Sequence, residues 1–314
     1  AVIGAGHLGE FHIKLLKSSK FFNLIGFHDL DKSRAKYIID KYKISFIEIT
    51  KISSLVDAVV ISTPTSFHYE SAVRFLNKNK HVFIEKPITS TIDQANKLIE
   101  IKNNNKLIGQ VGHVERFNSA FINIKNALNP MFIESHRLSS YPSRGTDVSV
   151  VLDLMIHDID IILSLVDSKI TKISANGTKI ISTSPDIANA RIEFENGSVA
   201  NLTASRISLK NMRKTRFFQK DAYISIDFLK KKSEIIKIKN LDSKKGELAL
   251  ILKNSEGEKK QIYFDSPSIK KTNAILDELE SFALSIKSKK EPEVTFEQAT
   301  EALRIAELII KSFQ

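Results

Sequence analysis

Asp153, His157 and Asp160 form a cluster of side chains that could handle a proton. They are spaced four and three residues apart, so on a helix all three project from one face. Histidine has the ordinary pKa nearest neutrality, which suits an imidazole that takes a proton from a hydroxyl as a hydride departs. Asp153 could orient that imidazole or bind a substrate hydroxyl. A structural Asp–His pair and a metal site are the alternatives, and we expect no metal because the paired-histidine zinc signature is absent from this segment.

A lysine stands at the end of a second candidate element. The strand-like residues Phe83-Ile84 run into Glu85-Lys86-Pro87. Ligands of open parallel sheets bind at the carboxyl ends of the strands, so Lys86 could place a positive charge beside a developing alkoxide. The proline restricts the loop that carries the lysine. A solvent-exposed lysine in a turn is the other interpretation of these residues.

The N-terminus carries a glycine pattern, Gly4-Ala5-Gly6-His7-Leu8-Gly9, between a strand-like and a helix-like segment. Such glycines permit a tight turn, close approach of a pyrophosphate and close packing of helix on strand, and the helix N-terminus attracts phosphate. Asp29 follows Gly9 by twenty positions, where its carboxylate would accept hydrogen bonds from ribose hydroxyls. Together they favour a dinucleotide site over a glycine-rich turn of an unrelated domain. Asp29 would repel a 2′-phosphate, so we expect NAD rather than NADP, although Lys32 and Arg34 are near enough to soften that preference.

The elements that must position these residues alternate between strand and helix in the first part of the chain, which is typical of βαβ units around a parallel sheet. The expected strands are Ala1–Ile3, Leu24–His28, Ala58–Ser62, His81–Glu85 and Leu107–Val111. The expected helices are His7–Lys17, Ser33–Tyr42, Phe67–Asn77 and Ile92–Asn103. We therefore predict an α/β domain with a doubly wound parallel sheet over residues 1–118.

The rest of the chain has a different pattern. A helix is expected over Val148–Val166, and Asn196-Gly197 supplies the turn of a hairpin between Ile187–Glu195 and Ser198–Ile207. Further strands are expected at Ala222–Phe228, Glu234–Lys239, Glu247–Leu252 and Gln261–Phe264, followed by helices at Asn273–Ser288 and Thr295–Phe313. This pattern predicts an α+β domain over residues 119–314 with a large, mostly antiparallel open sheet. A sheet covered by helices on one face only would leave an apolar face, so we expect a homo-oligomer, a dimer or a tetramer.

Composition excludes several classes of protein. The 314 residues are 42% hydrophobic and 26% charged, as in soluble globular proteins, and no apolar run approaches the ~20 residues of a membrane span. The absence of cysteine excludes disulfides, thiolate zinc sites and cysteine nucleophiles, and makes a cytoplasmic location the default expectation. The first residue is Ala1 within a strand-like segment, so we expect a short piece of chain to precede it.

The net charge of +11 comes from lysines spread along the chain rather than gathered in one arm. Nucleic-acid binding requires a concentrated basic stripe, so we expect no nucleic-acid partner. A basic surface would attract phosphorylated small molecules, and simple solvation of the surface explains the lysines equally well.

Taken together, these motifs resemble the Gfo/Idh/MocA family of oxidoreductases over essentially the whole chain. The resemblance rests on Gly4 to Gly9, on Ser62-Thr63-Pro64 with His68, on Glu85-Lys86-Pro87, and on Asp153 with His157 and Asp160. It implies a Rossmann domain, then a domain with a large antiparallel sheet, and an active site between them. It implies that Lys86 and His157 are catalytic with Asp153 beside them. The residues that it implies for the lining of the cofactor site are Thr63, Pro64, His68 and Glu85.

Two further segments are similar to the nucleotide-sugar 3-dehydrogenase branch of that family. They are Gly112 to Asn118 and Arg144 to Asp153. This similarity implies that Arg116, Asn118 and Arg144 meet substrate hydroxyls or phosphate, for which arginine is well suited, and an interdomain salt-bridge network is the alternative. Val150 and Val151 replace a glycine pair of the family, and Met155 replaces a small residue, which bears on the shape of the pocket.

The expected reaction is therefore NAD-dependent oxidation of a sugar hydroxyl to a ketone, at C3 of a UDP-linked amino sugar. A dehydrogenase of inositol or of a free sugar is an alternative within the same family. A dinucleotide-sensing protein without turnover is an alternative from another class. The lysine, aspartate and histidine argue against a sensor, which has no need of a proton acceptor.

Overall fold

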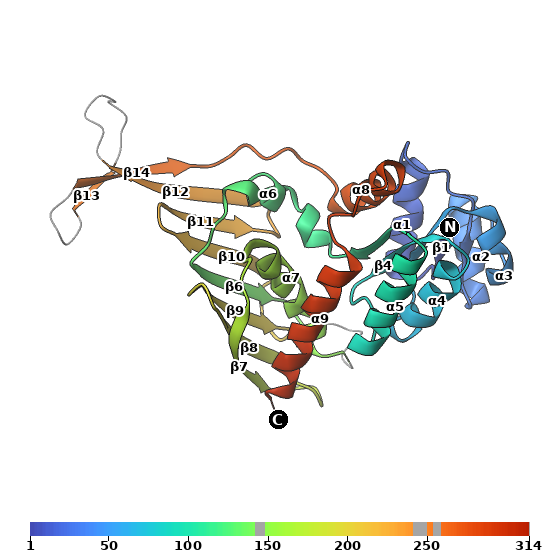
Figure 1. Cartoon of the computed structure of the whole chain (residues 1–314), viewed down its shortest axis with the longest axis horizontal. Coiled ribbons are helices and arrows are strands. Elements are labelled where there is room, and N and C mark those ends of the chain that lie inside the picture. Colours follow the sequence, from blue (N-terminus) through green and yellow to red (C-terminus); the bar gives the residue numbers. More distant parts are fainter. Residues whose placement is uncertain (142–147, 241–249, 254–258, 314) are drawn as a thin grey trace. The chain divides into compact units, whose positions relative to one another are not determined.

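The chain forms two compact units, which are described separately (Figure 1). The computed structural model describes residues 1–141, 148–240, 250–253 and 259–313. The first unit comprises Ala1–Phe117 and Thr272–Ile305, and the second comprises Asn118–Lys271 and Ala306–Gln314. The predicted domains, 1–118 and 119–314, differ from this division because part of the C-terminal helical region belongs with the first unit.

The first unit contains a five-stranded parallel sheet in the order β2-β1-β3-β4-β5. Its strands are β1 (Val2–Ile3), β2 (Phe27–His28), β3 (Ala58–Ile61), β4 (His81–Glu85) and β5 (Gly109–Gly112). From β1 the chain adds β2 on one side and β3, β4 and β5 on the other, so the strand order reverses between β1 and β3. Parallel sheets of this kind bind ligands at the carboxyl ends of the strands beside such a reversal. The predicted doubly wound sheet is confirmed, with β2 shorter than the predicted Leu24–His28.

The helices of this unit begin at recognisable caps. They are α1 (His7–Ser18), α2 (Lys32–Tyr42), α3 (Ile49–Leu55), α4 (His68–Leu76), α5 (Ile92–Asn104) and α8 (Ala274–Ser288), and the first unit also takes in α9 (Phe296–Lys311) as far as Ile305. Asp31 accepts hydrogen bonds from the backbone N–H groups of Ser33 and Arg34, which fixes the start of α2. Thr91 caps α5 in the same way through Gln94. The cap at Asp31 matters for the site because it sets Arg34 in the first turn of α2.

Helix α8 completes the core of the first unit although it lies late in the chain. Leu279 and Phe282 are fully buried in the same cluster as Val2, Ile13 and Phe83. The rings of Phe83 and Phe282 meet edge to face with centroids 5.9 Å apart. The returning chain also bonds to the edge of the sheet, where the amide N–H of Val111 donates to the carbonyl of Val294. These contacts are the physical reason why Thr272–Ile305 belongs with the parallel sheet.

The second unit is built on a mixed, mostly antiparallel sheet with nine described strands. Their order is β13-β14-β12-β11-β10-β6-β9-β8-β7, and β6 with β9 is the parallel pair. The strands are β6 (Phe132–Leu138), β7 (Ile170–Thr178), β8 (Ile187–Phe194), β9 (Val199–Ser205), β10 (Met212–Gln219), β11 (Ala222–Asp227), β12 (Lys232–Asn240), β13 (Leu250–Lys253) and β14 (Lys259–Asp265). The predicted large antiparallel sheet is confirmed. The predicted hairpin turn is at Gly197, which has a φ of +84°.

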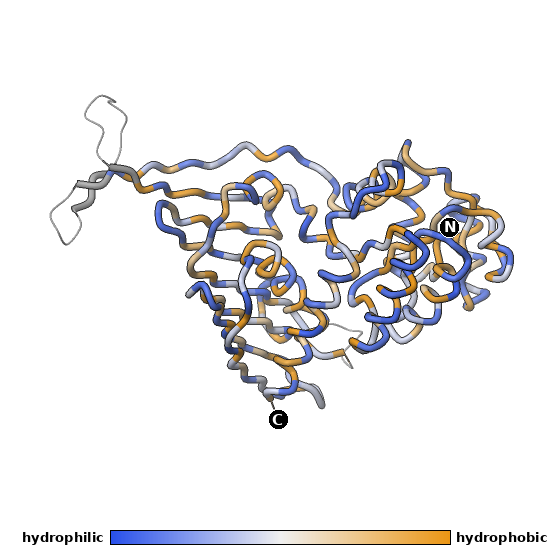
Figure 2. Tube along the Cα trace, in the orientation of Figure 1, coloured by the Kyte–Doolittle hydropathy of each residue, from blue (hydrophilic) through white to orange (hydrophobic). Residues whose placement is uncertain are grey.

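Helices cover one face of this sheet. They are α6 (Ser119–Ile122), the π-helical segment Val151–Met155 and α7 (Ile156–Leu165). In β8 and β9 the buried residues are mostly small or apolar and alternate with more exposed ones, and Figure 2 colours each residue of these strands by its hydropathy. Arg137 of β6 donates two hydrogen bonds, of 2.8 and 2.9 Å, to the carboxylate of Asp158 on α7. Both side chains are buried, so this pair fixes α7 on the sheet.

The other face of the sheet carries an aromatic row. Phe132, Phe218 and Tyr223 are neighbours in register across three strands, with ring centroids 5.7 and 5.1 Å apart. Phe132 and Phe218 remain 36% and 38% exposed, whereas the alternating residues Phe217 and Ile224 are buried. The described helices of the unit therefore leave this strip uncovered. No helix among the described residues is long and apolar enough to cross a membrane.

Truncation of Phe282 tests the place of α8 in the first core. Phe282→Ala removes a fully buried ring, so we expect the free energy of unfolding to fall by about 3–5 kcal/mol. Leu284→Ala on the same helix is the matched control, because Leu284 is 49% exposed and its loss should cost well under about 1 kcal/mol. Urea denaturation of the full chain measures both. Equal losses in the two variants would contradict the buried position of α8.

Candidate active site

Two glycines of the first loop are required by the packing of the protein itself. Gly4 has a φ of +84°, and a Cβ there would lie 2.8 Å from the backbone nitrogen of Thr63. A Cβ on Gly9 would lie 2.0 Å from the carbonyl oxygen of Gly4 and 2.8 Å from Oγ of Ser62. The turn after β1 can therefore approach β3 this closely only when both positions lack a side chain.

Gly6 has no such explanation within the chain. Its φ of −62° suits any residue, and a Cβ there would meet nothing within 4 Å. Gly6 stands at the N-terminus of α1, where helix amides and the helix dipole attract phosphate. A glycine at this position leaves open the approach that a pyrophosphate would take, so these residues fit a bound dinucleotide.

Asp29 lies against the same loop. One carboxylate oxygen accepts a 2.6 Å hydrogen bond from the amide N–H of Ala5, and the other accepts a 2.8 Å bond from the amide of Asp31. Each oxygen keeps a further lone pair for a ribose hydroxyl. Asp29 borders a cavity of about 400 Å³ at the carboxyl ends of β1, β2 and β3. Other residues of its lining are Gly4, Leu30, Thr63, Pro64 and Phe67.

Arg34 is turned onto the glycine loop. Its Nε donates a 2.6 Å hydrogen bond to the carbonyl of Ala5, and a terminal nitrogen donates a 3.2 Å bond to the carbonyl of Gly6. The same guanidinium pairs with the carboxylate of Glu10 on α1. From the sequence, Arg34 is expected to weaken the preference for NAD over NADP. To do so, it would have to break these contacts. Lys32, the other cation considered, is exposed.

Glu85 ends β4 and is bonded to a buried histidine. Its Oε1 lies 2.6 Å from Nε2 of His12 on α1, and its Oε2 accepts a hydrogen bond from the amide of Lys86. Burial alone would raise the pKa of Glu85, but the hydrogen bond and charge of His12, with the charge of Lys86, hold it below its usual value. Glu85 therefore fixes the backbone at Lys86, and it does so as a carboxylate.

His68 joins the loops that follow β3 and β4. Its Nδ1 lies 2.9 Å from the carbonyl oxygen of Pro87, and its Nε2 lies 2.9 Å from that of Thr63. Burial lowers the pKa of His68, which favours the neutral ring. Thr63 and Pro64 line the cavity, whereas His68 and Glu85 are buried residues that hold the loops in place.

In the second unit, Asp153 and His157 lie on two different kinds of helix. Asp153 is in the π-helical segment, and His157 is in the first turn of α7. The sequence predicts one α-helix over Val148–Val166, but the wider π-turn occurs where Val151 and Met155 are fully buried. Such turns are frequent at functional sites. Asp153 and His157 are partly exposed, whereas Asp160 is only 1% exposed.

The start of this helical region is held by a buried arginine. Arg206 on the chain after β9 donates a 2.6 Å hydrogen bond to the carbonyl of Val148. Its Nε pairs with Asp186 at 3.0 Å, and Asp186 also accepts three backbone N–H bonds from residues 180–182. Sequence analysis does not find this network, because its members are polar residues in loops that come together only in the folded unit.

The three predicted substrate residues have different surroundings. Arg116 is 5% exposed in the 3₁₀ segment Val114–Phe117. Asn118 is also buried, where its Oδ1 accepts from the amide of Ala120 and its Nδ2 donates to the carbonyl of Phe228. Arg144 lies outside the described residues. Among the described residues, no group of three or more His, Asp or Glu could hold a metal ion.

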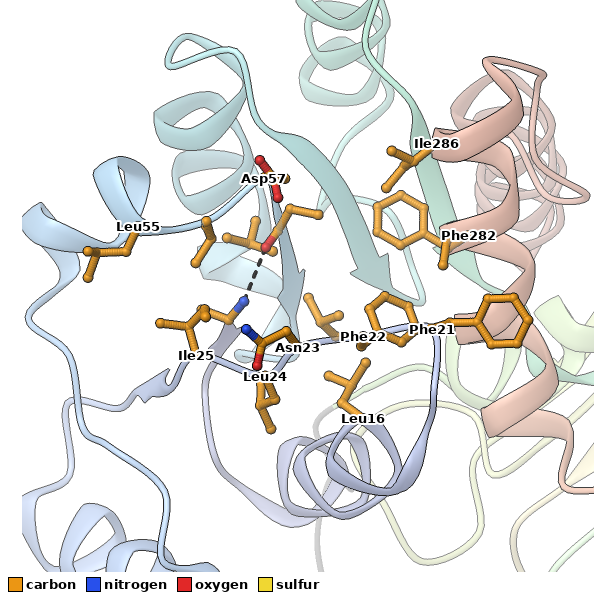
Figure 3. A pocket seen from close by; sticks show the side chains of 16 residues that line it. Leu16, Phe21, Phe22, Asn23, Leu24, Ile25, Leu55, Asp57, Phe282 and Ile286 are labelled. Carbon is orange, nitrogen blue, oxygen red and sulfur yellow. Dashed lines mark hydrogen bonds between the residues drawn. The ribbon is translucent and has the colours of Figure 1, made fainter.

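A second cavity lies at the other end of the parallel sheet (Figure 3). Its volume is about 260 Å³, and it opens at the amino ends of β1 and β3, next to the 3.1 Å bond from Ala1 N to Ala58 O. Figure 3 shows Leu16, Phe22 and Phe282 facing it. Ligands of such sheets bind at the opposite, carboxyl edge, and this lining is largely apolar, so we do not assign the chemistry here.

Comparison with known proteins gives one family and several relatives. A family model described as "Oxidoreductase family, NAD-binding Rossmann fold" matches residues 1–113, and a model of the GFO/IDH/MocA C-terminal domain matches residues 108–223. UDP-N-acetylglucosamine 3-dehydrogenase from Acidithiobacillus ferrooxidans is 35% identical over 231 residues, which are 73% of each chain. The NAD-dependent scyllo-inositol 2-dehydrogenase from Bacillus subtilis is 29% identical over 66% of this chain and 67% of its own.

A solved structure of the Acidithiobacillus ferrooxidans enzyme has the same fold. It superposes with a TM-score of 0.88 at 28% identity, covering 99% of this chain and 96% of the other. The two family models together span more than half of the chain, and they meet at the end of the parallel sheet. The chain therefore belongs to the Gfo/Idh/MocA family of oxidoreductases, and its first unit is an NAD-binding Rossmann fold.

Proposed function

We propose that the protein oxidises the C3 hydroxyl of a UDP-linked amino sugar to a ketone, with NAD as the acceptor. The single observation that carries the cofactor half of this proposal is Gly6, a glycine at the N-terminus of α1 where a Cβ would meet nothing within 4 Å of the protein, which leaves room for a pyrophosphate. The substrate half is supported by the 35% identity to a UDP-N-acetylglucosamine 3-dehydrogenase. When bound, the nicotinamide supplies a hydride acceptor.

The first unit is proposed to bind the cofactor and to stabilise charge. The amides at the start of α1 would face the pyrophosphate, and Asp29 would accept hydrogen bonds from the adenosine ribose. Lys86 would hold its ammonium beside the substrate oxygen as that oxygen loses its proton. The partly buried hydrogen bond from the amide of Lys86 to Glu85 supports this role, because it limits movement of the lysine backbone.

The second unit is proposed to supply the proton acceptor. An imidazole nitrogen of His157 would take the hydroxyl proton, and the carboxylate of Asp153 would stabilise the resulting charge. The ion pair between Arg137 and Asp158 supports this role, since it fixes the helix next to His157. Substrate contacts are assigned to Arg116, Asn118 and Arg144, as the motifs imply. For Asn118, the two bonds within its own unit favour positioning of the chain over direct contact.

A substrate comparison tests the proposal directly. We expect the kcat/KM of NADH formation for UDP-N-acetylglucosamine to exceed that for free N-acetylglucosamine by about a hundredfold or more, since phosphate contacts contribute binding energy. The panel includes scyllo-inositol, because an inositol dehydrogenase is among the relatives. A higher kcat/KM for scyllo-inositol than for UDP-N-acetylglucosamine would show that the preferred substrate is a polyol rather than a nucleotide sugar. No turnover with any of these compounds would refute the dehydrogenase proposal for these substrate classes.

The role of Lys86 predicts a defect in turnover rather than in cofactor binding. Lys86→Met should lower kcat by about 10²–10³-fold, as for other groups that stabilise a developing oxyanion. The Kd for NADH should change less than about twofold, because the role is in the transition state. Lys78→Met is the control, since Lys78 is an exposed lysine between α4 and β4. An unchanged kcat in Lys86→Met would show that the lysine does not take part in the reaction.

Two glycines of the loop, Gly9 and Gly6, predict opposite phenotypes. Gly9→Ala places a Cβ 2.0 Å from a carbonyl oxygen, so we expect a loss of stability, measured as a lower Tm without ligand. Gly6→Ala meets nothing within 4 Å, so its Tm should match the wild type while its Kd for NADH rises by about tenfold or more. If Gly6→Ala binds NADH normally, the pyrophosphate does not approach this position.

A further inference from the structure

Glu10 on α1 is the centre of a polar network that the proposed mechanism does not use. Its Oε1 accepts hydrogen bonds of 2.8 Å from both Nζ of Lys41 and the hydroxyl of Tyr42. Its Oε2 pairs with the guanidinium of Arg34. The hydrogen bond from Lys41, together with those from Arg34 and Tyr42, lowers the pKa of Glu10 to about 2 although partial burial opposes the shift. Glu10 is therefore an anion throughout the neutral range.

Arg34 is held by this anion in one orientation. The guanidinium contacts the carbonyls of Ala5 and Gly6 and the carboxylate of Glu10 at the same time. It also lies 4.8 Å from the ring of Tyr37, which covers one of its faces. The charge of Arg34 is therefore balanced by Glu10 within the protein, although the side chain is still 27% exposed.

Arg34 and Asp29 act on the same residue of the loop. Asp29 accepts from the N–H of Ala5, and Arg34 donates to the carbonyl of Ala5. The aspartate that would receive the adenosine ribose is thus a neighbour of a cation. A phosphate on the 2′ oxygen of that ribose would be a stronger ligand for arginine than two backbone carbonyls are. A guanidinium that already bonds to the glycine loop and to Glu10 has fewer N–H groups to offer such a phosphate.

We propose that Glu10 is a coenzyme-specificity residue. By holding Arg34 against the glycine loop, it keeps the guanidinium from pairing with a 2′-phosphate, so discrimination against NADP depends on Glu10 as well as on Asp29. This inference rests on the dinucleotide site of the proposed function. Coenzyme specificity would then depend on Glu10 of α1 as well as on Asp29, which follows β2.

Direct titration of the full chain with NADH and with NADPH tests the inference without any sugar. Nicotinamide fluorescence gives the Kd of each coenzyme for the wild type and for Glu10→Gln, which keeps the shape of the side chain and removes its charge. We expect the ratio of the NADPH Kd to the NADH Kd to fall about fivefold, the size of one partly exposed ion pair. An unchanged ratio would overturn the inference.

Two further variants separate a released Arg34 from a general change of charge. Asp40→Asn makes the same charge change on α2 at an exposed residue, and its ratio should equal that of the wild type. The double variant Glu10→Gln with Arg34→Gln should lose the gain for NADPH. A gain of equal size in Asp40→Asn, or a gain that persists without Arg34, would show a general electrostatic effect and would overturn the role of Glu10.

Glu10→Asp keeps the inference testable if Glu10→Gln does not fold. The shorter side chain retains the charge but withdraws it from Arg34, so the ratio should fall in the same direction, and an unchanged ratio in a folded Glu10→Asp would overturn the proposal. Thermal unfolding followed by circular dichroism verifies the fold of each variant. Failure of the wild type to bind either coenzyme is a different result, because it would refute the dinucleotide site itself.

Discussion

The close approach of the β1–α1 turn to β3 is the constraint on which the rest of the site depends. Gly4 and Gly9 allow it, since side chains at these positions would collide with the backbone of Thr63 and with Gly4 itself. Once the turn is that tight, the amides of α1 open toward the carboxyl edge of the sheet. The side chains of Asp29 and Arg34 then fix the N–H and the carbonyl of Ala5. The backbone of the glycine loop is therefore held by contacts within the protein itself.

Sequence patterns predicted the parts of this protein whose signal is local. The glycine loop, the strand before Glu85 and the hairpin at Gly197 all depend on residues within one short segment. Strands β6, β7 and β10 escaped prediction. In β6 the buried face carries Ser135 and Arg137 beside Ile133, and β10 carries Arg216 among further polar residues, so neither shows the clear alternation of apolar and polar residues that indicates a strand. In the folded unit these charges are matched across elements, by Asp158 and by Glu134. When the partners of a strand's polar residues lie on other elements, its local sequence resembles that of a loop.

The site residues that sequence reasoning missed are those defined by distant partners. His12 and Glu85 are 73 residues apart, and Glu10 and Arg34 are 24 apart, so no spacing rule connects them. The π-turn at Asp153 was missed for a related reason. It coincides with the burial of Val151 and Met155, and helical periodicity reports only that the segment is apolar on one side. Local pattern indicates which residues could carry the chemistry, whereas tertiary packing decides how they are held.

The first unit is discontinuous, and this has a consequence for how the chain is made. Its core takes Leu279 and Phe282 from α8, and Gln110 of β5 donates a hydrogen bond to the carbonyl of Glu278. A ribosome delivers these residues only after the whole antiparallel sheet has emerged. The nascent Rossmann unit therefore lacks part of its apolar core until α8 has been translated. Vectorial synthesis thus delivers the described strands of the antiparallel sheet before the helix that completes the core of the nucleotide-binding unit, although the parallel strands of that unit are made first.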